Sequence, residues 1–349
     1  MLIKTLKLND YRNYSRCFIE FDPHLNIIVG KNGTGKTNIL ESIILVSNTK
    51  SFRTQNDADV IKKNSDYARV ELVSDKGIFK VVVNKKNKSL YINDQIISRT
   101  SQFIGKLNAV LFKPSDLELF TQSPGERRKL LDIEVSKVSQ RYIQALVQYN
   151  SLLKDKNKIL KELEIDETLF AVINESMTPL IRTIIEEREK FFMLINDNIS
   201  DMYSMISGKE SKIEIIYKKC SEIEDIAQTL NDSREKDDYY HYATFGPHHE
   251  DYRFMMDGYD LNSIASQGQK RMVLIAFKFA LVKYIQQYTG NTPIVLLDDI
   301  LSELDKDNEE RLLNILPQDT QVIITDTDIN NLKIDDRYKL IELREGYHV

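Results

Sequence analysis

Residues 30–37 form a glycine-rich segment with the sequence Gly30-Lys31-Asn32-Gly33-Thr34-Gly35-Lys36-Thr37. It matches the pattern G-x-x-x-x-G-K-[S/T]. An apolar run over 25–29 predicts a strand before it, and apolar residues at helical spacing over 36–46 predict a helix after it. Glycines let the backbone N–H groups point at phosphate oxygens, and the helix N-terminus adds positive potential. The segment therefore predicts a loop for ATP, with Lys36 on the β- and γ-phosphates and Thr37 on Mg²⁺.

A second nucleotide element is expected far along the chain, where the apolar run 294–297 ends in Asp298 and Asp299. Alone, this pattern also fits an ordinary strand that ends in an acidic turn. Together with the glycine-rich loop it predicts a Walker B strand, in which Asp298 holds Mg²⁺ through water and Asp299 polarises the attacking water.

A predicted helix directly before this strand opens with Ser266-Gln267-Gly268-Gln269. Ser266 is a natural N-cap, so the pattern also fits a simple capped helix. Its place before the acidic strand resembles the signature of ABC ATPases, which completes the ATP site of the opposite subunit. Residues 302–305, which end in Asp305, resemble the D-loop that follows.

Composition indicates an ordinary folded protein without a global positive field. The chain has 349 residues, 42% of them hydrophobic and 29% charged, and a net charge of −5. Any contact with DNA must then come from a local patch. The two cysteines, Cys17 and Cys220, fit neither a disulfide framework nor a metal site. No apolar run is long enough for a membrane segment, and a cytoplasmic location is expected.

The order of the predicted elements favours an α/β head interrupted by a helical lobe. Residues 1–122 are mostly strands, with an antiparallel meander over 70–92. Residues 123–237 contain long helical patterns, in which Pro179 is expected to kink or interrupt the second long helix. Residues 238–349 return to alternating helices and strands, typical of a parallel sheet. We therefore expect an ABC ATPase head in two parts, 1–122 and 238–349, around a helical lobe.

Several motifs together resemble the RecF family of bacterial DNA repair proteins. They are the glycine-rich loop, the signature, the Walker B and D-loop stretch, Asp10-Tyr11-Arg12-Asn13-Tyr14 and Phe245-Gly246-Pro247-His248-His249-Glu250-Asp251. The resemblance spans the whole chain. It implies a homodimer that forms on ATP, slow ATP hydrolysis, DNA binding, and work with RecO and RecR to load RecA at gaps.

The chain departs from the family pattern in places. His249 and Glu250 replace the usual Arg-Asp, and a metal site at the two histidines is a weak alternative. Asp299 replaces the glutamate common in transporters, and its shorter arm predicts slow hydrolysis. Arg12 is a candidate for the γ-phosphate, although a surface arginine fits almost as well. The Q-loop is expected at the turn 112–114, although no glutamine marks it.

The expected DNA contacts are lysines of one predicted hairpin, Lys85, Lys86 and Lys88, because no acid lies between Lys76 and Lys88. An exposed turn that is merely lysine-rich is an equally good interpretation. Two other functions stay open: a transporter ATPase subunit, and a chromosome-structural ATPase of the SMC type. The long helical insert argues against the first, and the absence of room for coiled coils of hundreds of residues argues against the second.

Overall fold

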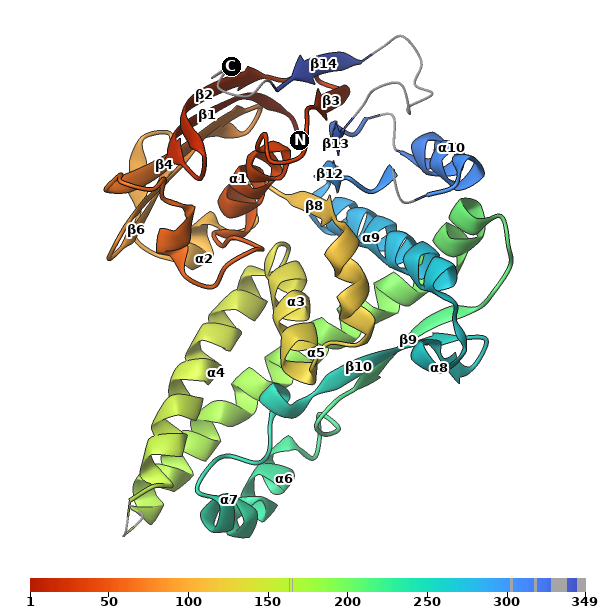
Figure 1. Cartoon of the computed structure of the whole chain (residues 1–349). Coiled ribbons are helices and arrows are strands. Elements are labelled where there is room, and N and C mark those ends of the chain that lie inside the picture. The colour runs from red at the N-terminus through yellow and green to blue at the C-terminus, as the bar shows by residue number, and fades with distance from the viewer. Residues whose placement is uncertain (163, 165, 302–303, 317–318, 328–337, 344–349) are drawn as a thin grey trace. The chain divides into compact units, whose positions relative to one another are not determined.

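The computed structural model describes residues 1–162, 164, 166–301, 304–316, 319–327 and 338–343 (Figure 1). The chain divides into two compact units. The first unit comprises Met1–Leu117, Asp201–Glu210 and Arg271–Val349, and the second comprises Glu118–Ser200 and Ser211–Lys270.

The first unit contains a six-stranded antiparallel sheet in the order β2-β1-β4-β5-β6-β7. The strands are β1 (Ile3–Tyr11), β2 (Tyr14–Glu20), β4 (Tyr67–Ser74), β5 (Gly77–Asn84), β6 (Lys88–Ile92) and β7 (Gln95–Ile97). Buried side chains alternate along β4 with side chains that are half-buried or, at Tyr67, exposed, as expected of a sheet with one face on the core. The short helix α2 (Thr100–Phe103) and the 3-10 helix η1 (Asp57–Val60) accompany this sheet.

A parallel sheet in the order β14-β3-β13-β12-β8 forms the other half of the first unit. Its strands are β3 (Leu25–Val29), β8 (Ala109–Phe112), β12 (Ile294–Asp298), β13 (Val322–Asp326) and β14 (Lys339–Glu342). Strand β12, which lies between β13 and β8, is buried at every residue, which explains its uninterrupted apolar sequence. Helices α9 (Gln267–Thr289) and α10 (Lys306–Ile315) belong to the C-terminal part of the chain.

Helix α1 (Lys36–Asn48) contacts strands of both sheets, among them β4 and β5 on one side and β12 and β13 on the other (Figure 1). Its apolar residues Ile39, Leu40, Ile43 and Ile44 are almost fully buried in one core with residues of both sheets. The first turn of this helix is therefore fixed to the ends of the parallel strands, which is the mixed α/β arrangement that the sequence predicts.

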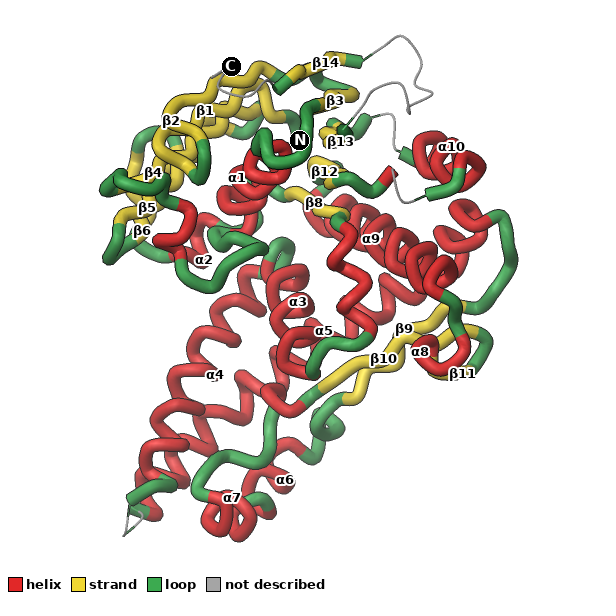
Figure 2. Tube along the Cα trace, in the orientation of Figure 1, coloured by secondary structure: helices red, strands yellow, loops and turns green. Residues whose placement is uncertain are grey.

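The second unit is mainly helical (Figure 2). It contains the 3-10 helix η2 (Pro114–Phe120) in part, α3 (Pro124–Ser136), α4 (Gln140–Ile159), most of α5 (Glu167–Ser207), α6 (Ile226–Asp232), α7 (Arg234–Tyr240), η3 (Pro247–His249) and α8 (Leu261–Ile264). Ser123 and Ser139 cap α3 and α4. Pro179 lies inside α5 and does not interrupt it. The carbonyl of Pro179 accepts a hydrogen bond from Thr183 Oγ1 at 3.0 Å.

A three-stranded sheet in the order β11-β10-β9 lies in the second unit. Because of it, the second unit extends beyond residue 237, where the helical lobe was expected to end. Strand β9 (Ile213–Lys218) pairs along its length with β10 (Asp251–Met256), and β10 pairs with β11 (Tyr259–Asp260). This pairing keeps 211–270 in one unit, so the second unit does not end at 237. The signature residues 266–269 consequently fall in the second unit rather than in the head.

Candidate functional site

The glycine-rich loop connects β3 to α1 in the first unit. Gly33 and Gly35 have φ angles of 86° and 108°, which L side chains rarely adopt. A Cβ atom at Gly35 would lie 2.5 Å from Tyr14 Oη, so a larger residue cannot fit there. Lys31, Asn32 and Gly33 are exposed, whereas Lys36 is buried within the loop. Lys36 Nζ donates to the carbonyl oxygens of Gly30 at 2.5 Å and Lys31 at 3.2 Å.

The hydroxyl group of Thr37 and the carboxylate of Asp298 lie side by side, although 261 residues separate them. Thr37 Oγ1 donates to Asp298 Oδ1 at 3.1 Å, and Thr325 Oγ1 donates to the same oxygen at 2.8 Å. Burial raises the pKa of Asp298, and these two hydrogen bonds oppose that rise. Hydroxyl and carboxylate oxygens are the ligands that Mg²⁺ prefers, usually with substrate phosphates and water. Thr37 and Asp298 therefore have the donor oxygens that would hold a magnesium ion.

Asp299 follows Asp298 at the carboxyl end of β12. Its φ angle is 55°, a left-handed conformation that is uncommon for residues other than glycine. Its backbone N–H donates to the Thr325 hydroxyl at 3.1 Å. Thr325 thus touches both aspartates from the neighbouring strand β13, with which β12 is in parallel register. The sequence marks Thr325 only by its place near the end of the apolar run that forms β13.

The turn between β1 and β2 packs on the glycine-rich loop. Asn13 Nδ2 and Tyr14 Oη both donate to the carbonyl of Thr34, at 3.2 and 3.3 Å. Asn38, in the first turn of α1, donates to Asn13 Oδ1 at 2.8 Å. Asn13 and Tyr14, the residues that follow Arg12, therefore support the glycine-rich loop. These contacts were missed in the sequence because they join residues twenty or more positions apart.

Arg12, the expected γ-phosphate ligand, pairs with the buried carboxylate of Glu41. Arg12 Nε donates to Glu41 Oε2 at 2.9 Å, and its Nη1 donates to the carbonyl of Asp59 at 2.8 Å. The Glu41 side chain is fully buried, and hydrogen bonding to it raises the pKa of Arg12. Arg12 thus ties the β1–β2 turn to α1, and its role toward the γ-phosphate stays a prediction.

Arg53 is a further cation at this site that sequence reasoning missed. Its Nη1 donates to Asn38 Oδ1 at 2.7 Å and lies 3.8 Å from Glu41 Oε2. Its side chain is 46% exposed. The positive charge of Arg53 is close enough to oppose the rise in the pKa of Asp298.

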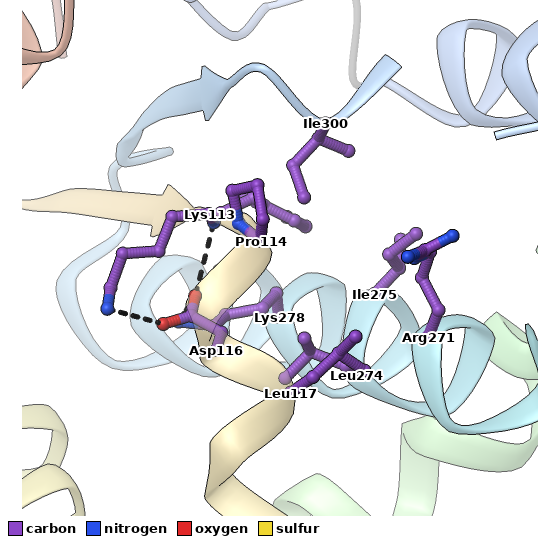
Figure 3. A pocket seen from close by; sticks show the side chains of 10 residues that line it. Lys113, Pro114, Asp116, Leu117, Arg271, Leu274, Ile275, Lys278 and Ile300 are labelled. Atoms are coloured by element: carbon purple, nitrogen blue, oxygen red, sulfur yellow. Dashed lines mark hydrogen bonds and ion pairs between the residues drawn. The ribbon is translucent and has the colours of Figure 1, made fainter. Parts of the chain in front are cut away.

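The turn 112–114, proposed for the Q-loop, leaves the parallel sheet beside β12, because Phe112 pairs with Leu297. Asp116 lies here between two lysines, at 3.4 Å from Lys113 and 2.9 Å from Lys278 (Figure 3). The adjoining pocket has a volume of about 10 Å³, enough for about one water molecule. This turn is therefore packed by ion pairs and holds no glutamine.

The signature residues begin α9 with a reciprocal pair of hydrogen bonds. Gln269 N donates to Ser266 Oγ at 3.2 Å, and Ser266 N donates to Gln269 Oε1 at 2.9 Å, which is a capping box. Ser266, Gln267 and Gly268 are exposed. Nothing beyond Ser266 Oγ, at 4.0 Å, approaches the position of a Cβ atom at Gly268. The N-terminus of α9 is thus exposed to solvent.

The expected D-loop is described only in part. Ser302 and Glu303 lie outside the described residues. Asp305 is the N-cap of α10, and its Oδ1 accepts from Asn308 N at 2.9 Å. The Asp305 carboxylate therefore has a local capping role, and its D-loop role stays a prediction.

The two histidines of the Phe245–Asp251 motif are bound inside the second unit. Tyr149 Oη lies 2.5 Å from His248 Nδ1, and the Nε2 atoms of His248 and His249 lie 3.0 and 3.1 Å from the carbonyl of Ala243. Burial lowers the pKa of His248 to about 4. Among the residues that the structure describes, no group of three His, Cys, Asp or Glu side chains could hold a metal ion. The hydrogen bonds of His248 and His249 indicate a structural role inside the second unit rather than metal binding.

Glu250, which departs from the family motif, is the centre of a buried network. Its carboxylate accepts from the Arg188 guanidinium, the Tyr217 hydroxyl and, at 3.0 Å, the backbone N–H of Cys220. Arg188 also donates to Asp132 Oδ1 at 2.8 Å. The network joins α3, α5 and β9, so Glu250 has a structural role that the sequence did not reveal.

The three lysines expected to contact DNA are not equivalent. Lys88 is 15% exposed and pairs with Asp57 at 2.7 Å. Lys85 is 68% exposed and pairs with Asp66 at 3.1 Å, and Lys86 is exposed at the β5–β6 turn. The acids come from other segments, so a sequence window without acids did not exclude ion pairs. Lys88 is a poor candidate for DNA contact, whereas Lys85 and Lys86 remain available.

Comparison with known proteins gives the family. Residues 2–346 match the RecF/RecN/SMC N terminal domain family. The DNA replication and repair protein RecF of Lysinibacillus sphaericus is 34% identical over 100% of this chain and 98% of its own length. The protein of that name from Lactobacillus delbrueckii subsp. bulgaricus is 33% identical over 95% of this chain and 92% of its own. The chain belongs to the RecF family.

Solved structures agree with this membership. A structure described as the recombination mediator protein RecF-ATP in the RecFOR pathway has a TM-score of 0.91 at 28% identity, with 99% of this chain and 96% of that chain covered. An Smc head domain from Pyrococcus furiosus has a TM-score of 0.57 at 20% identity, covering 99% and 94%, which shows a shared fold alone. The expected ABC-type head is therefore confirmed. In the described part of the chain, no helix is both long and apolar enough to cross a membrane.

Proposed function

We propose that this RecF-family protein is an ATP-driven homodimer that binds DNA at gaps and, with RecO and RecR, helps to load RecA during recombinational repair, replication and the SOS response in the cytoplasm. The observation that carries the proposal is the pairing of Thr37 with Asp298 at 3.1 Å beside the glycine-rich loop. Family membership supports it, because a solved relative is described as RecF-ATP.

Different residues of the first unit would bind ATP and catalyse its hydrolysis. The N–H groups of 30–35 and the Lys36 ammonium would hold the phosphates, and Thr37 and Asp298 would hold Mg²⁺. Asp299 would orient the attacking water. Because aspartate has a shorter arm than glutamate, we expect slow turnover, which suits a dimerisation switch.

The ATP site would be completed by the other subunit. The exposed start of α9 presents Ser266, Gln267 and Gly268 next to backbone N–H groups, where a γ-phosphate would be favourable. Gln269 holds Ser266 in place through the capping box. Asp305 is proposed to approach the same site in trans.

The alternatives fit less well. A transporter ATPase or a chromosome-structural ATPase does not predict the near full-length match with proteins named RecF. The likeness to Smc heads concerns the fold and carries no function.

The proposal is tested by light scattering with ATP and Mg²⁺ on the wild type, Lys36→Ala and Asp299→Asn. Wild type should dimerise. Lys36→Ala should stay monomeric, because the phosphates lose their main cationic partner. Asp299→Asn should bind ATP and accumulate as a dimer, with hydrolysis reduced by about 100-fold or more. A wild-type protein that stays monomeric, or a Lys36→Ala protein that dimerises with ATP as wild type does, would contradict the proposal.

A further inference from the structure

Cationic side chains gather at one end of the six-stranded sheet, where β1 and β5 end and β2, β4 and β6 begin. We define the basic sheet end as Arg16, Lys62, Lys63, Arg69, Lys85 and Lys86, with Tyr67 among them. In this antiparallel sheet these strand termini lie at the same end of the sheet, so residues from three distant stretches of the chain come together.

Strand register places several of these groups on one face. Asn9 pairs with Arg16 on one side and with Arg69 on the other, so the two arginines lie two strands apart. Adjacent strands are spaced by about 4.8 Å, which separates their Cα atoms by roughly 10 Å. Tyr67 lies two residues before Arg69 on the same face and pairs with Asn84, next to the turn that carries Lys85 and Lys86.

Lys62 and Lys63 complete the group from the segment that precedes β4. Lys62 N donates to the Asp10 carbonyl at 2.8 Å, and Lys62 Nζ donates to Ser15 Oγ at the start of β2. Lys63 and Lys86 are exposed. Both lysines can therefore reach a ligand in solvent.

The charge balance at this end is positive, in contrast to the whole chain. At this end, the strands and turns that carry the six cations of the basic sheet end contribute three carboxylates, Asp10, Asp66 and Glu71. The neighbouring acid Asp57 is paired with Lys88, which is not counted among the six. The chain as a whole carries a net charge of −5. Glu71 pairs with Arg69, and the 94% exposed Asp66 with Lys85. A local basic patch on an acidic protein attracts polyanions without a global field.

Tyr67 adds a second kind of contact. Its side chain is 49% exposed between cationic neighbours. A tyrosine ring in such a place can stack on an unpaired base while lysines and arginines contact the phosphates. A duplex offers the phosphates but no unpaired base.

We propose that the basic sheet end binds the phosphodiester backbone of DNA, with Tyr67 stacking on a base where the DNA is single-stranded. The proposal rests on the proposed DNA binding and assigns it a surface. Lys88 is excluded from this surface because its side chain is only 15% exposed and pairs with Asp57, whereas the paired Lys85 is 68% exposed. The same end adjoins the ATP loop, because Tyr14 at the start of β2 donates to the carbonyl of Thr34.

The test measures DNA affinity of the full chain with ATP and Mg²⁺ by fluorescence anisotropy, using an oligo-dT strand and a duplex of equal length over a salt series. The triple variant Lys63→Ala/Lys85→Ala/Lys86→Ala should weaken both DNAs by about 10-fold or more. It should also reduce the slope of log affinity against log salt by up to about 2.7 for the duplex. The matched control is Lys154→Ala/Lys158→Ala/Lys161→Ala, three exposed lysines of the second unit, which should leave both slopes unchanged.

Tyr67→Ala should weaken binding of the single strand by about fivefold or more and leave the duplex unchanged. Tyr239→Ala, at a 77% exposed tyrosine of the second unit, is its control and should have no effect. If the wild type binds DNA and the first triple variant keeps its slope, the surface assignment is wrong while the proposed function stands. If Tyr67→Ala affects both DNAs equally or neither, the stacking role is wrong. If the wild type binds neither DNA, the proposed function itself fails.

Discussion

Asp298 is a proposed ligand residue whose buried carboxylate lowers the free energy of unfolding when no metal is bound. Burial raises its pKa, so the folded protein holds this proton to a higher pH than the unfolded chain does. The free energy of unfolding therefore falls as pH rises from the ordinary carboxyl pKa through the raised one, and the full penalty is present above both. Asp298→Asn removes the charge and keeps an oxygen for Thr37 and Thr325. We expect it to raise the melting temperature at pH 7 in the absence of nucleotide, and to weaken Mg²⁺-dependent ATP binding by about 10-fold or more.

Comparing pH 7 with pH 4.5 provides the control for this substitution, because the gain in melting temperature should shrink as the wild-type carboxyl group becomes protonated. Thr37→Val is the matched variant for metal binding, since it removes the hydroxyl ligand without removing a charge. If Asp298→Asn melts below the wild type at pH 7, the carboxylate stabilises the empty fold and our interpretation of its pKa is wrong.

At the scale of elements, α4 and α7 are joined by an ion pair that is fully buried on both sides. Lys156 Nζ lies 2.8 Å from Asp237 Oδ2, and Asp237 Oδ1 accepts from Thr244 N at 2.7 Å. Lys156 also lies over the Phe170 ring of α5, at 4.8 Å from its centre. Burial lowers the pKa of Lys156, opposed by Asp237. Asp237→Asn keeps the acceptor for Thr244 but leaves a buried ammonium unpaired, so we expect it to destabilise the fold by about 3 to 5 kcal/mol in urea unfolding.

The second substitution Lys156→Met separates charge from packing. Added to Asp237→Asn, it should recover most of the lost stability, because the apolar side chain needs no partner. A double variant that is no more stable than Asp237→Asn would mean that the loss came from disturbed packing around Thr244.

At the scale of the whole molecule, the proposed ATP site belongs to two chains, and one substitution at the exposed start of α9 tests this. Ser266→Arg should leave each monomer able to bind ATP but block closure of the dimer, because the added bulk occupies the helix N-terminus. Mixing Ser266→Arg with Lys36→Ala protein should restore part of the hydrolysis. In a mixed dimer one composite site holds both defects and the other holds neither. The measurement is light scattering together with phosphate release.

Gln140→Arg, at another exposed helix start of the second unit, is the control for added bulk and charge and should dimerise as wild type does. A Ser266→Arg protein that closes normally on ATP would remove the signature from the mechanism.

The sequence alone determined the parts of this protein whose chemistry is local. The spacing from Gly30 to Thr37 dictates the loop, and an apolar run before Asp298 and Asp299 dictates a buried strand with acids at its end, because backbone geometry acts over a few residues. The tertiary structure decided which side chains pair with one another. The pairing of Lys88 with Asp57, of Arg12 with Glu41 and of Glu250 with Arg188 depends on strand register and helix packing between segments far apart in the chain. The division at 270 rather than 237 follows from the pairing of β9 with β10, whose residues are more than thirty positions apart.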